Sequence, residues 1–152
     1  MSTETPTVRL HRVIKAPAER VYHAFTDPDA MCRWLPPYGF LGKIHEADIR
    51  EGGSCHMSFT NFGTGSSHSF RIRYVEMVQN SKLRYTDQFD DPSMPELMEV
   101  TVTFRQGMAG TELTVVQANI PAQIPLEFCY LGWQESLAQL AHLVEPEIPD
   151  GA

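Results

Sequence analysis

The sequence predicts an α+β fold in which consecutive antiparallel strands form one sheet and a long helix covers one face of it. Apolar residues recur at every second position through residues 40–117, which is typical of strands. They recur at every third or fourth position through residues 126–145, which is typical of a helix. One strand and two short helices precede the run of strands. Such segregation of strands from helices is typical of α+β proteins, so we expect a layered structure with one core.

The N-terminal region predicts a strand followed by two short helices. Residues 8–15 alternate between apolar and polar side chains, which indicates a strand near the edge of the sheet. Pro17 is suited to the first turn of a helix, where its missing N–H costs nothing. Asp27 followed by Pro28 predicts the cap and first position of a second helix, which Pro36 and Pro37 end.

The central region predicts six strands that are apolar on one face and polar on the other. Expected strands span residues 40–50, 54–62, 70–74, 83–89, 98–105 and 113–117. The first two are joined by a tight turn at Glu51, Gly52 and Gly53. We expect both glycines to supply the positive φ that such a turn needs.

The C-terminal region predicts a helix with one apolar stripe, which Pro146 and Pro149 end. The stripe consists of Leu126, Cys129 or Tyr130, Trp133, Leu137, Leu140 and Val144. A sheet of this length twists and curls, so a straight helix cannot fill its concave side everywhere. We therefore expect an internal cavity, the kind of space in which small ligands bind.

Length, charge and cysteine content narrow the class of protein. The 152 residues suit one domain of roughly 100–200 residues, and we expect a single domain over residues 1–152, with a core at about 8–144 and frayed ends. Twelve Lys and Arg against nineteen Asp and Glu give a net charge of −7, which argues against nucleic acid and anionic lipid surfaces as partners. Three widely spaced cysteines fit neither a disulfide framework nor a zinc site.

Targeting and cofactor signals are also missing from the sequence. No run of 18 apolar residues predicts membrane insertion, and the polar N-terminus does not resemble a signal peptide, so we expect a cytoplasmic protein. The six histidines form no helical pair, and no phosphate loop or nucleophile elbow occurs. We accordingly assign no metal, no cofactor and no catalytic residue.

Several short motifs resemble a known superfamily in their order and spacing. Those that resemble the START-like (SRPBCC, Bet v-type) superfamily are Ala16-Pro17-Ala18-Glu19-Arg20-Val21 and Thr26-Asp27-Pro28 followed by Arg33-Trp34. Those similar to its branch named for the activator of the heat-shock chaperone ATPase are Asp48-Ile49-Arg50-Glu51-Gly52-Gly53, Tyr74-Val75-Glu76, Leu83-Arg84-Tyr85-Thr86, Gly110-Thr111-Glu112-Leu113 and Gly132-Trp133-Gln134-Glu135-Ser136-Leu137. The resemblance covers residues 8–144 and implies a helix-grip fold, a curved sheet of six or seven strands wrapped around the last helix. It implies no shared catalytic set, and Leu35 stands where this branch usually has a second Trp.

Four polar residues occupy strand positions whose side chains, by the alternating pattern, are expected on the apolar face of the sheet. They are His45, His68, Asp87 and Gln117. A buried carboxylate needs a partner or its pKa rises, so we expect Asp87 to meet a cation, hydrogen bonds or water, with His45 or His68 as a possible partner. Two interpretations remain open: these residues are solvated strand ends, or they orient a ligand's polar group or act as acid and base.

These considerations give a set of candidate ligand-binding residues. The set is Trp34, His45, Phe59, His68, Phe70, Tyr74, Tyr85, Asp87, Met98, Gln117, Cys129, Trp133 and Leu137. Two positions remain open for each tryptophan ring. Trp34 either closes the mouth of the cavity or packs in the core, and Trp133 either packs in the core or lines the cavity that would hold the ligand.

Three functions remain as hypotheses. The first is binding of a small, largely hydrophobic molecule, such as a lipid, in the cavity. The second is a cyclase- or hydrolase-like enzyme that acts on an apolar substrate with Asp87 and a histidine. The third, which the resemblance implies, is a co-chaperone that stimulates a heat-shock chaperone ATPase. The eukaryotic activators carry an additional N-terminal domain that this sequence does not show, so we favour the first. The edge strand over residues 8–15 could pair with a second copy, and we expect a monomer or homodimer.

Overall fold

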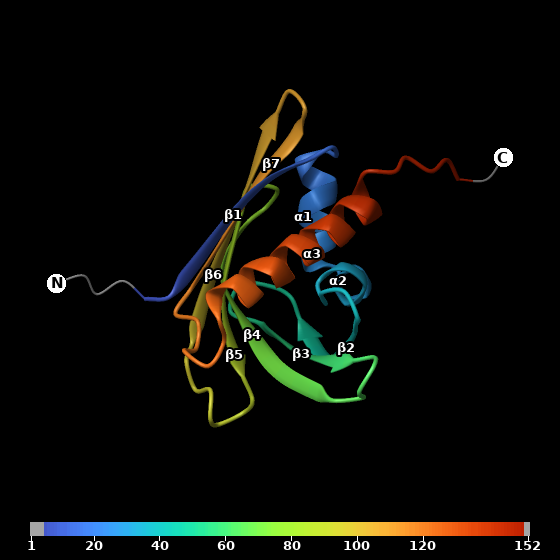
Figure 1. Cartoon of the computed structure of the whole chain (residues 1–152). Helices are drawn as coiled ribbons and strands as arrows, with labels where there is room; N and C mark the ends of the chain where they lie inside the picture. Colours follow the sequence, from blue (N-terminus) through green and yellow to red (C-terminus); the bar gives the residue numbers. More distant parts are fainter. Residues whose placement is uncertain (1–4, 151–152) are drawn as a thin grey trace.

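The computed structural model describes residues 5–150 and contains seven strands and three helices within that range (Figure 1). The elements in chain order are β1 (Thr7–Ile14), α1 (Ala18–Thr26), α2 (Pro28–Trp34), β2 (Phe40–Asp48), β3 (Ser54–Asn61), β4 (Ser67–Val78), β5 (Lys82–Phe89), β6 (Met98–Gly107), β7 (Gly110–Ala118) and α3 (Leu126–Val144). Every predicted strand and helix is present. The frayed ends expected at residues 1–4 and 151–152 lie outside the described residues.

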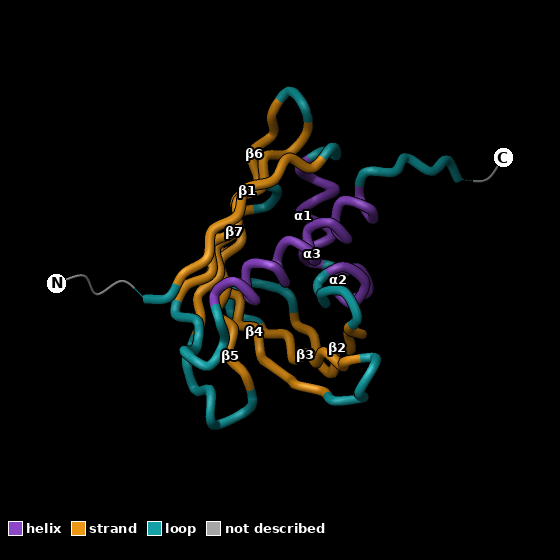
Figure 2. The backbone as a smooth tube through the Cα atoms, in the orientation of Figure 1, coloured by secondary structure: helices purple, strands orange, loops and turns teal. Residues whose placement is uncertain are grey.

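All seven strands form one antiparallel sheet in the order β1-β7-β6-β5-β4-β3-β2. The predicted edge position of the first strand is confirmed, because β1 pairs only with β7 in this order. The sheet curves, and α3 lies across its concave side (Figure 2). The α+β helix-grip architecture is therefore confirmed.

The two short helices begin where the sequence predicts. The Asp27 side chain accepts hydrogen bonds from the backbone N–H groups of Asp29 and Ala30, at 2.9 and 3.2 Å, and Pro28 occupies the first position of α2. Pro17 immediately precedes α1, and its carbonyl accepts the first hydrogen bonds of that helix. The Asp27 side chain thus satisfies backbone donors that α2 itself leaves free, whereas α1 begins without a side-chain cap.

The turn between β2 and β3 uses its two glycines differently from the prediction. Gly52 has a φ of +82°, as expected. Gly53 does not have a positive φ, so that half of the prediction is wrong. A Cβ atom at Gly53 would instead collide with the carbonyl oxygen of Asp48, and close backbone approach is the reason for glycine there.

The apolar stripe of α3 changes its environment along the helix. Its second half is buried, as predicted, at Leu137, Leu140 and Val144. At the start of the helix the prediction is wrong for Leu126, which is 39% exposed. Of the two alternatives at the next position, Cys129 is half-buried against the core and Tyr130 is 41% exposed. The first half of α3 contacts the sheet through Cys129 and Trp133, which hydrogen-bond Gln117 on β7, and the side chains leave a pocket beside these contacts. No helix in the described part of the chain is both long enough and apolar enough to cross a bilayer.

Candidate functional site

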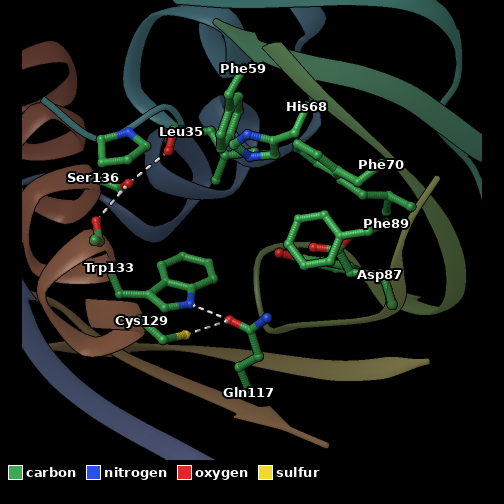
Figure 3. A pocket seen from close by; sticks show the side chains of 14 residues that line it. Leu35, Phe59, His68, Phe70, Asp87, Phe89, Gln117, Cys129, Trp133 and Ser136 are labelled. Carbon is green, nitrogen blue, oxygen red and sulfur yellow. Dashed lines mark hydrogen bonds between the residues drawn. The ribbon is translucent and has the colours of Figure 1, made fainter. Parts of the chain in front are cut away.

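A pocket of about 160 Å³ lies between the first half of α3 and the concave face of the sheet (Figure 3). Its walls come from the end of α2, from β3, β4, β5 and β7, and from α3. The lining residues are Leu35, Pro37, Phe59, His68, Phe70, Ile72, Tyr85, Asp87, Phe89, Gln117, Cys129, Gly132, Trp133 and Ser136. Most of these side chains are apolar, so the pocket favours apolar contents.

Aromatic rings form one side of the pocket. Phe59 and Phe70 pack edge to face with ring centroids 4.9 Å apart, and His68 lies 5.7 Å from both Phe59 and Phe89. Burial lowers the pKa of His68 below its ordinary value of 6.5, so the imidazole is neutral at physiological pH. His68 therefore adds to the aromatic wall rather than contributing a positive charge.

Gln117 forms the floor, and protein contacts use both ends of its amide. Its Oε1 accepts hydrogen bonds from Nε1 of Trp133 at 2.6 Å and from Sγ of Cys129 at 3.6 Å (Figure 3). Its Nε2 donates to Sδ of Met98 at 3.1 Å. The buried amide is thus satisfied, and its contacts fix the Trp133 ring as a wall of the pocket.

Hydrogen bonds also join α3 to the end of α2. The Ser136 hydroxyl lies 2.7 Å from the carbonyl oxygen of Leu35 and 2.9 Å from that of Gly132 (Figure 3). The Gln139 amide donates to the carbonyl oxygens of Trp34 and Pro36, at 3.1 and 2.5 Å. These contacts fix the position of α3 relative to the end of α2, which forms one side of the pocket.

Asp87 is the polar group of the pocket that lacks a partner. The residue is half-buried, but its Oδ1 atom is buried and has no hydrogen-bond partner within the described chain. Burial raises the pKa of this carboxyl from its ordinary value of 3.8 to about 7, although the backbone N–H of Gln88 partly offsets the effect. No hydrogen bond joins Asp87 to His45 or His68 among the described residues, so the acid–base pair required by the enzyme hypothesis is not formed here.

Burial keeps the other ionisable groups around Asp87 neutral. It raises the pKa of the Cys129 thiol, which lines the pocket, to about 11, and the pKa of the nearby Cys55 thiol to the same value. It also raises the pKa of the Tyr85 hydroxyl well above its ordinary value of 10. Lysine and arginine are absent from the lining residues. Asp87 is accordingly the one group in this pocket that can carry charge near neutral pH.

The structure brings together eight of the thirteen sequence-predicted site residues. Those that line the pocket are Phe59, His68, Phe70, Tyr85, Asp87, Gln117, Cys129 and Trp133. Their shared position agrees with the inward phase read from the sequence. Binding of a ligand by these residues stays a prediction.

His45 does not lie in the pocket, so its placement on the inner face is wrong. It is exposed, and its Nε2 lies 3.0 Å from the hydroxyl of Ser58 on the outer face of β3. The register of β2 with β3 shifts between Ile44 and Glu46. This β-bulge reverses the face to which the following side chains point, which a strict period of two does not anticipate.

Four other predicted residues belong to the core rather than to the pocket. They are Trp34, Tyr74, Met98 and Leu137, all buried and absent from the pocket walls. Trp34 does not close the cavity mouth: its Nε1 donates to the carbonyl of Ala24 at 2.8 Å, and its ring packs 4.5 Å from that of Phe25. Each of the four has the predicted inward phase but lies where the layers are in direct contact.

Six lining residues were not predicted from the sequence. They are Leu35, Pro37, Ile72, Phe89, Gly132 and Ser136. Ile72 and Phe89 lie two residues from predicted site residues on the same strands, and therefore on the same face of the sheet. Gly132 and Ser136 lie three and seven residues after Cys129, on the same face of α3. The periodicity of the sequence therefore contained a signal for these four residues. Leu35 and Pro37 lie at the end of α2 and just beyond it, where no period applies.

The sequence matches a family model described as Activator of Hsp90 ATPase homolog 1-like protein, over residues 15–145. No protein with a curated description matches the chain. Among solved structures, the crystal structure of protein CV1439 from Chromobacterium violaceum is 52% identical, with a TM-score of 0.92 over 93% of this chain and 99% of that one.

Two more distant structures share the fold. A protein from Staphylococcus epidermidis is 20% identical, with a TM-score of 0.80 over 100% of this chain and 98% of that one. The AHSA1-like protein from Aeromonas hydrophila is also 20% identical, with a TM-score of 0.73 over 91% and 92% of the two chains. At this level of identity the likeness concerns the fold alone.

Proposed function

This chain belongs to the family of Activator of Hsp90 ATPase homolog 1-like proteins, and we propose that it binds a small, largely apolar molecule in the pocket beneath α3. The observation that carries the proposal is the unfilled pocket itself. Small molecules bind in concave, mostly apolar pockets, and side chains leave about 160 Å³ of this one unfilled. Space of about this size accommodates a single aromatic ring.

The walls support the same class of ligand. An apolar guest would contact the rings of Phe59, Phe70 and Trp133, and each buried methylene would contribute about 0.8 kcal/mol. The Gln117 amide and the Ser136 hydroxyl already have protein partners, so they are poor sites for a polar group of the ligand. The pocket therefore suits a molecule with one apolar body and few polar atoms.

The position of Gly132 provides a way to test the proposal. A Cβ atom at this position would meet nothing within 4 Å, so a larger side chain there can extend into the pocket without displacing the backbone. Gln134, two residues further along α3, is exposed and does not line the pocket. The substitutions Gly132→Leu and Gln134→Leu thus add the same side chain to the same helix, inside and outside the site.

The experiment is an NMR titration of the full chain with toluene, benzyl alcohol and indole. We expect saturable shifts at the amides of Gly132, Trp133 and Phe70 with at least one of these probes. The shifts should be lost in Gly132→Leu and retained in Gln134→Leu. Absence of saturable binding by every probe, or equal binding by both variants, would remove the pocket as the functional site.

A second candidate, interaction with an Hsp90-type chaperone, has one observation in its favour. The first half of α3 exposes large apolar side chains, among them Phe128 at 66% and Leu131 at 49%. Exposed apolar residues of this kind mark surfaces that bind other proteins. Stimulation of Hsp90 ATPase activity by the chain, lost in Phe128→Asp, would support this candidate. Equal ATPase rates with and without the chain would contradict it.

A further inference from the structure

We infer that the pocket selects a small apolar amine, whose ammonium group pairs with the carboxylate of Asp87. The inference rests on the proposed function and adds the chemical class of the ligand. It starts from the carboxyl of Asp87, a half-buried residue of the pocket wall whose Oδ1 atom is buried and has no partner within the described chain. A carboxylate without a cation in such a site is costly, and a donor supplied by the ligand where this residue lines the pocket would lower that cost.

The charge of the site favours a cationic donor over a neutral one. Lysine and arginine are missing from the lining residues, and desolvation lowers the pKa of His68 below 6.5 although the residue is exposed overall, so at pH 7 and above protein side chains do not balance a carboxylate here. A charge-assisted hydrogen bond between ammonium and carboxylate is roughly twice as strong as a neutral one. The ligand would therefore provide the counter-charge that the protein lacks.

The aromatic wall supports the same cation. Phe89 comes from the same strand and the same face as Asp87, and the rings of Phe59 and Phe70 lie across the same pocket (Figure 3). Ring faces attract ammonium groups, with a contribution that grows when the site excludes water. A carboxylate beside aromatic rings is thus suited to an amine with an apolar body.

The same arrangement disfavours anionic ligands. A fatty acid or an aromatic acid would place a second carboxylate in a space that already holds Asp87 and offers no cation. Like charges in a buried site force one of them to bind a proton, which costs affinity. The inference thus excludes a class of ligand that the apolar walls alone would accept.

Binding of an amine should depend on pH through Asp87. The ionisable groups that face this carboxyl are Cys55 on β3, His68 and Tyr74 on β4, Tyr85 on β5 and Cys129 on α3. Burial raises the pKa values of the thiols and phenols, so these groups stay neutral between pH 6 and 8, and desolvation lowers the pKa of His68, which favours its neutral form. The carboxyl of Asp87 has a pKa of about 7, so at pH 6 it must release its proton to solvent before it pairs with the ammonium ion.

The test uses four probes of nearly equal size: benzylamine, benzyl alcohol, toluene and benzoate, titrated into the full chain by calorimetry at pH 8 and pH 6. At pH 8 we expect benzylamine to bind about tenfold or more tightly than toluene, and benzoate not to bind. Between pH 8 and pH 6 the affinity for benzylamine should fall about tenfold, as the ionised fraction of an acid with a pKa near 7 does. The affinities for toluene and benzyl alcohol should not change.

Two variants assign the preference to one residue. Asp87→Asn should abolish the preference for benzylamine and its pH dependence while binding of toluene persists. Glu99→Gln removes the same charge from an exposed position on the adjacent strand β6 and should behave as the wild type. The wild-type pH series gives an independent result if Asp87→Asn does not fold.

The outcomes separate this inference from the proposed function. Binding of toluene or benzyl alcohol with no preference for benzylamine at pH 8 would overturn the amine inference and leave the apolar pocket as the function. Tight binding of benzoate would have the same consequence. Failure of all four probes to bind would overturn both.

Discussion

The two halves of α3 are held in place by different forces. In the second half, Leu137, Leu140 and Val144 are buried against the rest of the core. In the first half, Trp133 donates a hydrogen bond to Gln117 of the sheet, the Ser136 hydroxyl lies 2.7 Å from the carbonyl oxygen of Leu35, and a pocket lies beside these contacts. One helix with one continuous apolar stripe thus serves as core at one end and as the roof of a binding site at the other. The two halves differ in what lies beside them, which is the core in the second half and the pocket in the first.

The comparison between the two halves of α3 is tested first by side-chain truncation, and we expect the largest loss of stability in the second half. Leu140 is fully buried, and Leu140→Ala should reduce the free energy of unfolding by about 3 kcal/mol, since it removes buried methyl groups and leaves a cavity. Leu131→Ala, at a half-exposed position of the first half, should change it by less than about 0.5 kcal/mol. Urea denaturation measures both. Similar losses in the two variants would mean that both halves contribute equally to the core.

The next effect concerns Asp87 and its dependence on pH. Because the folded-state pKa of about 7 lies above the ordinary value of 3.8, the folded protein keeps this proton to higher pH than the unfolded chain. Stability should therefore decline as the pH rises from about 4 to about 7, and the loss is complete above that range.

Asp87→Asn should remove this loss. The full shift corresponds to roughly 4 kcal/mol, and we expect the variant to be more stable than the wild type by about half of it, ~2 kcal/mol, at pH 8, because Asp87 is half-buried and solvent screens its charge; the difference should vanish near pH 4. Thermal unfolding at the two pH values measures it, with Glu99→Gln as a control that loses the same formal charge at an exposed site. A variant that is less stable than the wild type at pH 8 would show that the carboxylate has a favourable partner.

The contribution of the hydrogen bonds is tested at Gln117. In Gln117→Leu the indole N–H of Trp133 loses its acceptor, and we expect stability to fall by about 1.5 kcal/mol. Tryptophan fluorescence should also change, because the Trp133 ring is no longer fixed. Gln134→Leu, at an exposed site on α3, should leave both measurements unchanged. An unaltered emission spectrum in Gln117→Leu would indicate that packing alone fixes the ring.

The smallest effect is expected at Gly132, which lies inside α3 and lines the pocket. Glycine within a helix is less favourable than alanine, so Gly132→Ala should raise the free energy of unfolding by about 0.8 kcal/mol. The added methyl group projects into open space and narrows the pocket, so the affinity for toluene should fall at the same time. Gain of stability without loss of affinity would show that the glycine does not serve the pocket.

The periodicity of apolar residues in the sequence predicted the order of strands and helices and the side chains that point to the interior. Most of the residues that line the pocket are among these side chains. Asp87 and Gln117 were predicted because each is a polar residue at a position where the alternation of the strand predicts an apolar one. Both line the pocket. His45 was misplaced because a β-bulge changes the phase within β2, and a bulge has no fixed sequence signal. Leu35 and Pro37 were missed because the path of an irregular connection depends on tertiary contacts.

The sequence also could not separate core residues from pocket residues. Trp34, Tyr74 and Leu137 share the inward phase of Phe70 and Trp133, and the difference between them is whether an opposing layer reaches the side chain. That distance is set by the curvature of the sheet and by the hydrogen bonds at the end of α2. Neither is encoded in the alternation of polar and apolar residues along one strand.

The most direct test of the account is a crystal of the protein soaked with bromobenzene, with the bromine located by its anomalous scattering. We expect one strong bromine peak beneath the first half of α3, between Trp133 and the rings of Phe59 and Phe70, and a weaker peak or none in crystals of Gly132→Leu. A structure in which Trp133 and the aromatic wall meet and no bromine enters between them would contradict the account.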